Sequence, residues 1–190
     1  MFGWLATRST LLCRHAPQTL VSRRTRRMTP HTLMRHLPGL GSVLYLHAAS
    51  SAVVTDNLPP GLLVAQREFA PLLDTRWLVA TSAVTDDGPR EWCECVDRFG
   101  RPRARLHLLP DTDYLAWDAL MNSHGALDNP PPAWPRGQLL RPDNASVVNF
   151  HTRELAGLLV LDRGPAMVLS TLGGRIAAHI ATVESALLTG

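Results

Sequence analysis

The sequence predicts an α+β domain built on a curved antiparallel β-sheet meander with flanking helices. Four runs of six to nine residues, rich in apolar and β-branched side chains, follow one another in the first 110 residues. Short turn segments such as DDGP and RFGR separate the later runs, whereas parallel strands would need crossovers of helix length. Stretches with helical character stand before and after these runs.

The N-terminal half supplies the first helix and most of the strands. A short helix is expected from about Pro30, and Pro38 with Gly39 ends it, because proline does not continue a helix. After Gly41, SVLYLHA predicts a strand, SAVVTD predicts a second short strand, and NLPPG predicts a turn. Further strands are expected for LLVAQREF, RWLVATSAV, EWCECVD and PRARLHLLP.

The C-terminal half is expected to begin with the helix DTDYLAWDALMNSH, capped by Asp111 or Thr112. A proline-rich linker over residues 125–144 follows, which cannot form a regular element. Next come a helix over FHTRELAGLLVL, with Asn149 as its cap, and two strands in AMVLSTLGGRIAAHIATV around a Gly-Gly turn. The last residues, ESALLTG, form a short strand or fray.

The chain is long enough for one domain, assigned to residues 28–190. It has 190 residues, of which 45% are hydrophobic. Residues 1–27 carry six arginines and no acidic residue, and they resemble a mitochondrial transit peptide. A start that belongs at Met28 rather than Met1 is the preferred explanation. Residues 1–27 are therefore treated as disordered and outside the fold.

Charge and cysteine content narrow the functional classes. The whole chain has a formal charge of +3, but residues 28–190 hold 13 arginines against 16 acidic residues. Nucleic-acid binding is not expected, because this part offers no dense basic stripe. Membrane insertion is not expected either, since the apolar stretches are short. Three cysteines, Cys13, Cys93 and Cys95, form no disulfide framework, which fits a cytoplasmic protein.

Motifs that would identify an enzyme are missing from the sequence. It contains no phosphate-binding glycine loop, no GxSxG, no HExxH and no CxxC. Cys93, Cys95 and His107 lie on strands that pair, and thiolate and imidazole are zinc ligands. Two core cysteines and an ordinary histidine are the preferred interpretation of these three residues.

Several stretches, in collinear order, resemble the haem-utilisation family of HemS-type hemin transport or hemin-degrading proteins and ChuX-type proteins. LMRHLPGLGSVLYLHAASSAVVTD resembles the family's N-terminal segment, and LLDTRWLVATSAV resembles its Asp-Leu-Arg-Leu strand. EWCECVDRFGRPRARLHLL is similar to its hairpin, and DTDYLAWDALMNSH to the helix after it. GGRIAAHIATVESALLTG is similar to the strand pair that opens the second repeat. The resemblance covers about 33–124 and 150–190.

The resemblance implies haem b (hemin) as cofactor, bound in a cleft between two curved units. HemS-type chains contain both units, whereas ChuX-type chains contain one and dimerise. This chain resembles one unit and the start of a second, so a homodimer is expected. VNFHTRELAGLL loosely matches the segment with the family's iron-ligating histidine, which indicates His151, with His179 as the alternative.

Haem also carries two propionates, for which arginine forks are suitable partners. Arg76, Arg103, Arg105 and Arg153 are the candidates for these contacts. The favoured function is a cytoplasmic haem carrier in iron acquisition, and a haem-degrading activity is a variant of it. The alternative is a non-haem interaction or regulatory domain that keeps the fold but has lost the pocket.

Overall fold

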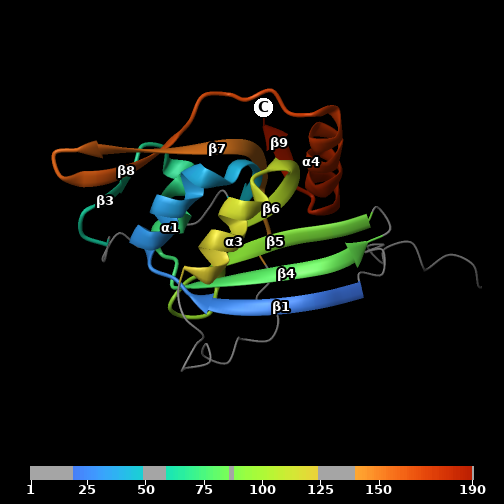
Figure 1. Cartoon of the computed structure of the whole chain (residues 1–190), viewed down its shortest axis with the longest axis horizontal. Helices are drawn as coiled ribbons and strands as arrows, with labels where there is room; N and C mark the ends of the chain where they lie inside the picture. Colours follow the sequence, from blue (N-terminus) through green and yellow to red (C-terminus); the bar gives the residue numbers. More distant parts are fainter. Residues whose placement is uncertain (1–18, 49–58, 86–87, 124–139, 190) are drawn as a thin grey trace, which may run out of the picture.

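The computed structural model describes residues 19–48, 59–85, 88–123 and 140–189, and it forms one nine-stranded sheet with helices against it (Figure 1). The strand order is β1-β4-β5-β6-β2-β7-β8-β3, and β9 pairs with β7. Among the described strands, only β3–β8 and β7–β9 are parallel pairs. The predicted α+β class with a curved, mainly antiparallel sheet and flanking helices is confirmed.

The helices and strands follow one another along the chain in a fixed order. They are β1 (Thr19–Arg27), α1 (Pro30–His36), the 3₁₀ helix η1 (Leu37–Leu40), β2 (Gly41–His47), β3 (Leu62–Val64), the 3₁₀ helix η3 (Arg67–Phe69), α2 (Ala70–Leu73), β4 (Trp77–Thr85), β5 (Gly88–Val96), β6 (Pro102–Thr112), α3 (Tyr114–Asn122), β7 (Asn144–Leu155), β8 (Leu158–Arg163), α4 (Thr171–Val183) and β9 (Leu187–Thr189).

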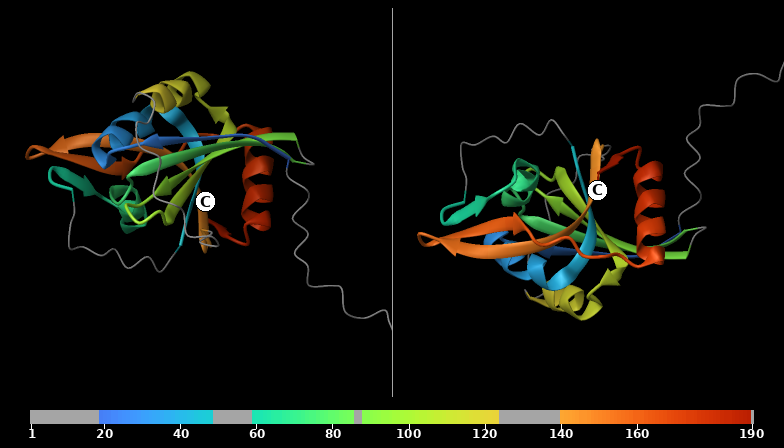
Figure 2. Two further views of the ribbon diagram at one scale, coloured as in Figure 1. Left: turned by 90° about the horizontal axis from the view of Figure 1, so that it is seen from below. Right: turned by 90° about the horizontal axis from the view of Figure 1, so that it is seen from above.

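Strand β2 is central because both of its faces are buried. Val43 and Tyr45 belong to the main core, together with the buried residues of α1, α2 and α3. Leu44 and Leu46 point to the other face, where they form a second cluster with Ala177 and other residues of α4. Figure 2 shows α4 apart from α1 and α3 in both views. Strand β2 thus carries the packing of two layers.

Two helix starts are explained by their caps. Thr29 caps α1, because its side chain accepts a hydrogen bond from the Thr32 amide at 3.1 Å. Asp113 caps α3 by accepting from the amides of Leu115 and Ala116, so the assignment of Asp111 or Thr112 to this role is wrong.

The residues first assigned to that cap have other partners. The Thr112 hydroxyl donates to the Ser42 carbonyl and accepts from the Leu109 amide. The Asp111 carboxylate accepts from the amide and the hydroxyl of Ser170, at 2.8 and 2.9 Å. Asp111 therefore ties the end of β6 to the start of α4.

The helix predicted over residues 150–161 is absent, and these residues form the β7–β8 hairpin instead. Ala156 and Gly157 make the turn with φ values of 50° and 79°, a two-residue turn that suits the twist of a hairpin. Burial alternates along β7 as expected for a strand, since Val148 and Phe150 are buried whereas Asn149 and His151 are more exposed. The leucines near the hairpin tip have helical spacing in the sequence, but Leu155 and Leu158 are exposed rather than packed in the core.

The two strands predicted around Gly173 and Gly174 are also wrong, because these residues lie in α4. Ser170 caps this helix by accepting from the Gly173 amide at 3.0 Å. Its buried residues Ala177, Ile180 and Ala181 have helical spacing. A side chain at Gly173 would collide with the Asp111 carboxylate, so this glycine serves a close approach rather than a turn.

Other predictions have mixed outcomes. The helix from Pro30 and the strands β2, β4, β5 and β6 are confirmed, as is the short strand near the end, β9. Only Leu62–Val64 of LLVAQREF is extended, and Arg67–Phe69 is a 3₁₀ helix. The strand SAVVTD and most of the proline-rich linker lie outside the described residues. Strand β7 begins at Asn144, the last residue assigned to that linker.

Strand β1 corrects the exclusion of residues 1–27 from the fold. Thr19–Arg27 pairs with β4 in an antiparallel ladder of eight residue pairs, so the exclusion is wrong for these nine residues. Residues 1–18 lie outside the described part. The arginines within residues 19–27 make this segment resemble a leader in sequence, although Val21 and Thr25 suit a strand.

We expect a chain that begins at Met28 to be less stable than one that begins at Thr19. Removing β1 leaves the backbone groups of β4 without their ladder partners. Urea unfolding followed by circular dichroism should give a lower midpoint for the chain that begins at Met28. Equal midpoints for the two chains would contradict the role of β1 in the fold.

Candidate functional site

The candidate site lies on one side of the β7–β8 hairpin and the adjoining β3. Strand register places His151 opposite Asp162 and Leu155 opposite Leu158, and Leu63 lies beside Val160. Because directly paired residues share a side and alternate residues along a strand do too, seven residues lie on the side away from the main core, and one of them, Val160, is buried. We call the other six the hairpin face, and its members are Leu63, His151, Arg153, Leu155, Leu158 and Asp162.

His151 is exposed on β7, beyond the last residue that pairs with β2. The prediction that it lies in the first turn of a helix is wrong, and so is the role of Asn149 as a helix cap. Asn149 is a strand residue opposite Ser42. His151 nevertheless presents an imidazole at the surface, with a carboxylate on the neighbouring strand.

Arg153 is two residues further along β7, on the same side as His151. Its Nε lies 3.6 Å from Oδ2 of Asp162, and its side chain is 49% exposed. A surface ion pair at this distance contributes little to stability. The ion pair instead orients the Arg153 side chain, because it holds one edge of the guanidinium beside the Asp162 carboxylate while much of the side chain is exposed to solvent.

Asp162 is held in place by neighbours from two elements. Its Oδ1 accepts from Gln66 Nε2 at 2.6 Å and from the Arg163 amide at 2.7 Å. These hydrogen bonds, with that from Gln66 as the largest cause, lower the pKa of this carboxyl, so it is ionised at neutral pH. The hairpin face therefore carries a fixed negative charge between an imidazole and a guanidinium.

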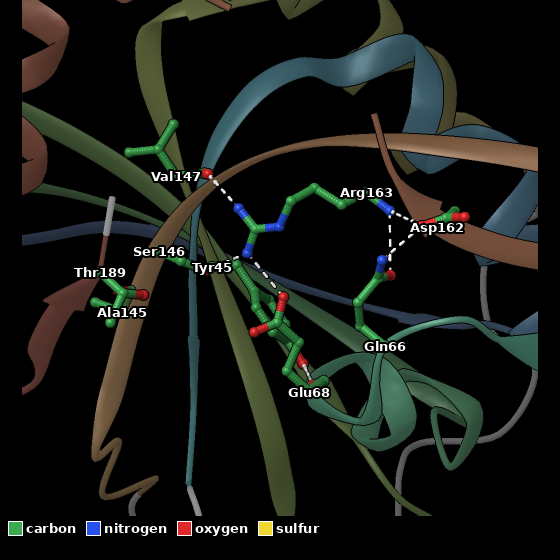
Figure 3. Close-up of polar contacts among 9 residues, drawn as sticks. All are labelled: Tyr45, Gln66, Glu68, Ala145, Ser146, Val147, Asp162, Arg163 and Thr189. Carbon is green, nitrogen blue, oxygen red and sulfur yellow. Dashed lines mark hydrogen bonds and ion pairs between the residues drawn. The ribbon is translucent and has the colours of Figure 1, made fainter. Parts of the chain in front are cut away.

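Arg163 supports the hairpin from the opposite side (Figure 3). Its Nη2 binds Oε1 of Glu68 at 2.7 Å, and its Nη1 donates to the Val147 carbonyl at 3.2 Å. The Tyr45 hydroxyl donates to the Glu68 carbonyl at 2.7 Å. These contacts connect β2, η3, β7 and β8. The sequence analysis did not identify Arg163, because its partners are up to 95 residues away along the chain.

Three leucines share the hairpin face with its polar residues, two at the hairpin tip and one on β3. Leu63, Leu155 and Leu158 are 40%, 49% and 37% exposed. Val160, on the same side of β8, is buried. Scattered exposed leucines are ordinary, but three on one side of adjacent strands give this face an apolar surface beside its charges.

The other predicted haem-binding residues are not part of this face. Arg105 is buried on β6, where its Nη2 binds Glu94 at 2.8 Å and its Nη1 binds Glu184. Arg105 lies two strands away from β7 at the level of Ala145, which places it about 20 Å from His151. Its contact with Glu184 fastens the end of α4 to the sheet.

Arg76 and Arg103 also lie elsewhere. Arg76 immediately precedes β4 and donates to the Thr75 carbonyl at 2.9 Å, and β4 is four strands from β7 in the sheet order. Arg103 Nη2 lies 3.6 Å from Asp74 Oδ2. His179, the alternative iron ligand, is exposed on α4. Among the predicted residues, His151 and Arg153 alone share the hairpin face, whereas Arg76 and Arg103 both lie near Asp74.

The cysteines and His107 do not form a common site. Cys93 and Cys95 pack in the main core, whereas His107 is paired with Trp92 and Leu44 on the other side of the sheet. A hydrogen bond with Cys95, and then burial, raise the pKa of the Cys93 thiol. No group of three or more histidine, cysteine or acidic residues suited to a metal ion occurs in the described ranges.

His107 is a buried residue that the sequence analysis ranked low. Both ring nitrogens are buried and lack a hydrogen-bond partner among the described residues, and the ring lies 5.7 Å from that of Trp92. Burial first, and then the charges of Arg105 and Arg90, lower its pKa well below the ordinary histidine range. The ring is therefore neutral at pH 7.

The comparisons with known proteins add no assignment. No protein-family model matches the chain, and no curated protein matches it significantly. Within the residues that the structure describes, no helix is long and apolar enough to cross a membrane.

We expect His107→Phe to be at least as stable as the wild type at pH 5. The unfolded histidine takes up a proton near pH 6.5 while the buried ring does not, so wild-type stability falls as pH drops below that value. Phenylalanine removes this loss and leaves no unsatisfied nitrogen. Urea unfolding from pH 7.5 to 5 measures the slope. An equally steep slope in both proteins would contradict the assignment.

Proposed function

We propose that the protein binds haem b on the hairpin face and acts as a cytoplasmic haem carrier in iron acquisition, with His151 as the iron ligand. One observation carries this proposal. An exposed imidazole and a partly exposed guanidinium lie two residues apart on one side of β7, and exposed leucines lie on the same side toward the hairpin tip and on β3. These are the three kinds of group that a porphyrin with propionates requires.

The imidazole of His151 is suited to be an axial ligand. Ferric haem, when bound, supplies an iron that accepts a nitrogen lone pair. Asp162 lies opposite His151 on β8 and is itself fixed by Gln66. A carboxylate that accepts the second ring N–H of a ligating histidine orients the ring and raises its basicity. The pairing of these strands thus favours His151 over His179, which has an exposed helical position.

Arg153 is the propionate partner in this proposal. Residues two apart on a strand are separated by about 7 Å, so its guanidinium lies to one side of the imidazole. The contact of Nε with Asp162 orients the side chain, and the planar fork suits a carboxylate. Arg76 and Arg105 are replaced in this role, because each lies far from β7 and has other partners.

The apolar part of the face gives the macrocycle a surface to lie against. Leu155 and Leu158 form a cross-strand pair at the hairpin tip, and Leu63 adds to them from β3. Burial of leucine surface stabilises a complex by about 25 cal/mol per Å² of apolar area. The described residues of a single chain supply no second wall that would cover the opposite side of the porphyrin.

This openness favours a carrier over a haem-degrading enzyme. Catalysis on haem requires a site that excludes water, which one open face does not supply. A second copy placed over the hairpin face would cover the porphyrin, which agrees with the expected homodimer. Sedimentation should then show that added hemin raises the dimer fraction.

An interaction domain without haem is the second candidate. The exposed leucines of the hairpin face are equally suited to a protein partner, since aliphatic side chains pack against either. The two candidates differ in one requirement. Haem binding depends on the imidazole, whereas docking through the leucines does not.

We expect hemin titration of the wild type to give a red-shifted Soret band and a low-micromolar or tighter dissociation constant. His151→Ala should alter the band and weaken binding, because the iron loses its ligand. His179→Ala is the matched control, since it removes an exposed histidine from α4, and it should leave both quantities unchanged.

An unchanged free-hemin spectrum at stoichiometric wild-type protein would contradict haem binding and favour the interaction domain. A band that changes only in His179→Ala would show that the ligand assignment is wrong. Arg153→Ala should weaken binding while the position of the band stays that of the wild type, because the iron ligand is retained.

A further inference from the structure

Strand β1 forms one edge of the sheet and is long for an edge strand. It has nine residues, and among the described strands it pairs with β4 alone. Its other side therefore has a row of backbone N–H and C=O groups that no described strand satisfies. Such an edge is a template for the addition of another strand.

The same strand carries the densest positive charge of the described fold. Arg23, Arg24, Arg26 and Arg27 lie within five consecutive residues, which span about 14 Å of an extended chain. Arg23 Nη2 lies 3.8 Å from Glu94, and Arg24 and Arg27 are exposed. The expectation that the fold has no basic stripe assumed that residues 1–27 lie outside it.

We propose that β1 is a docking edge for an extended acidic segment of a partner protein, which adds to the sheet as a further strand. Two features act together in this proposal. The backbone row binds any extended chain, and the arginines select one with carboxylates because like charges repel. A second copy of β1 is disfavoured for the same reason, since its four arginines would face these four.

Backbone hydrogen bonds to the open edge of β1 would distinguish an acidic strand from other polyanions. Phosphates of nucleic acids or lipids would contact the guanidinium groups but would leave the backbone row without partners. An extended peptide satisfies both. At the start of the strand, Leu20 and Val21 are exposed, so an apolar residue next to the acidic ones in the partner has a surface to contact.

The experiment uses the full chain and a fluorescent octapeptide that alternates glutamate with valine or threonine. Binding is measured by anisotropy. Two control peptides are used with the wild-type protein. One has alternate backbone amides methylated, which keeps the charge and removes hydrogen-bond donors. The other has lysine in place of glutamate.

We expect saturable binding of the acidic octapeptide and affinity at least about tenfold lower for each control peptide. The double variant Arg24→Glu/Arg27→Glu should lose affinity by about the same factor. Arg175→Glu changes the charge of an exposed arginine on α4 and should not affect binding. Circular dichroism confirms that the variants are folded.

Absence of saturable binding by the acidic octapeptide would overturn the proposal. Equal affinity for the methylated peptide would overturn it too, because charge attraction alone, without backbone hydrogen bonds to β1, would then explain the binding. Tighter binding of a single-stranded oligonucleotide of equal charge than of the octapeptide would show a polyanion surface instead. None of these outcomes depends on hemin, so this test is independent of the proposed haem function.

Discussion

The register between β2 and β7 determines which residues of β7 face each of the two hydrophobic clusters. Six consecutive residue pairs, from Ser42↔Asn149 to His47↔Asn144, join these strands inside the core. Val148 on β7 then faces the main core, and Ala145 faces α4. A slip of one residue would exchange the two sides of β7, so burial within the core also determines which side His151 and Arg153 occupy further along the strand.

Long-range polar contacts keep this arrangement in place. Arg163 joins β8 to Glu68 and to the Val147 carbonyl, and Asp111 joins the end of β6 to the start of α4. The buried set of Arg105 and Glu94, with Glu184 at the end of α4, fastens that helix at its other end. Breaking such a buried pair is costly even where forming it adds little net stability. The hairpin thus projects from a scaffold that is fixed on both faces (Figure 2).

Local signals predicted the fold better than the site. Turn segments and β-branched residues were sufficient for β2, β4, β5 and β6, because hairpin meanders depend on neighbours in sequence. The hairpin of β7 and β8 resembles a helix in sequence, because its leucines have helical spacing and the alternation of burial is visible only once the core is known. Gly173 resembled a turn residue, although a close approach by Asp111, 62 residues earlier, requires it. His151 and Arg153 were selected through a resemblance and an arginine preference, and tertiary structure was needed to separate them from Arg76 and Arg105.

The proposed haem site depends on the β2–β7 register, because this register places His151 on the exposed side of β7. The most direct measurement is resonance Raman spectroscopy of the ferrous haem complex, in the region of the iron–histidine stretch. If His151 binds the iron, this band is present in the wild type, is lost in His151→Gly, and returns when free imidazole is added to that variant. A band that persists unchanged in His151→Gly without imidazole would show that His151 is not the ligand.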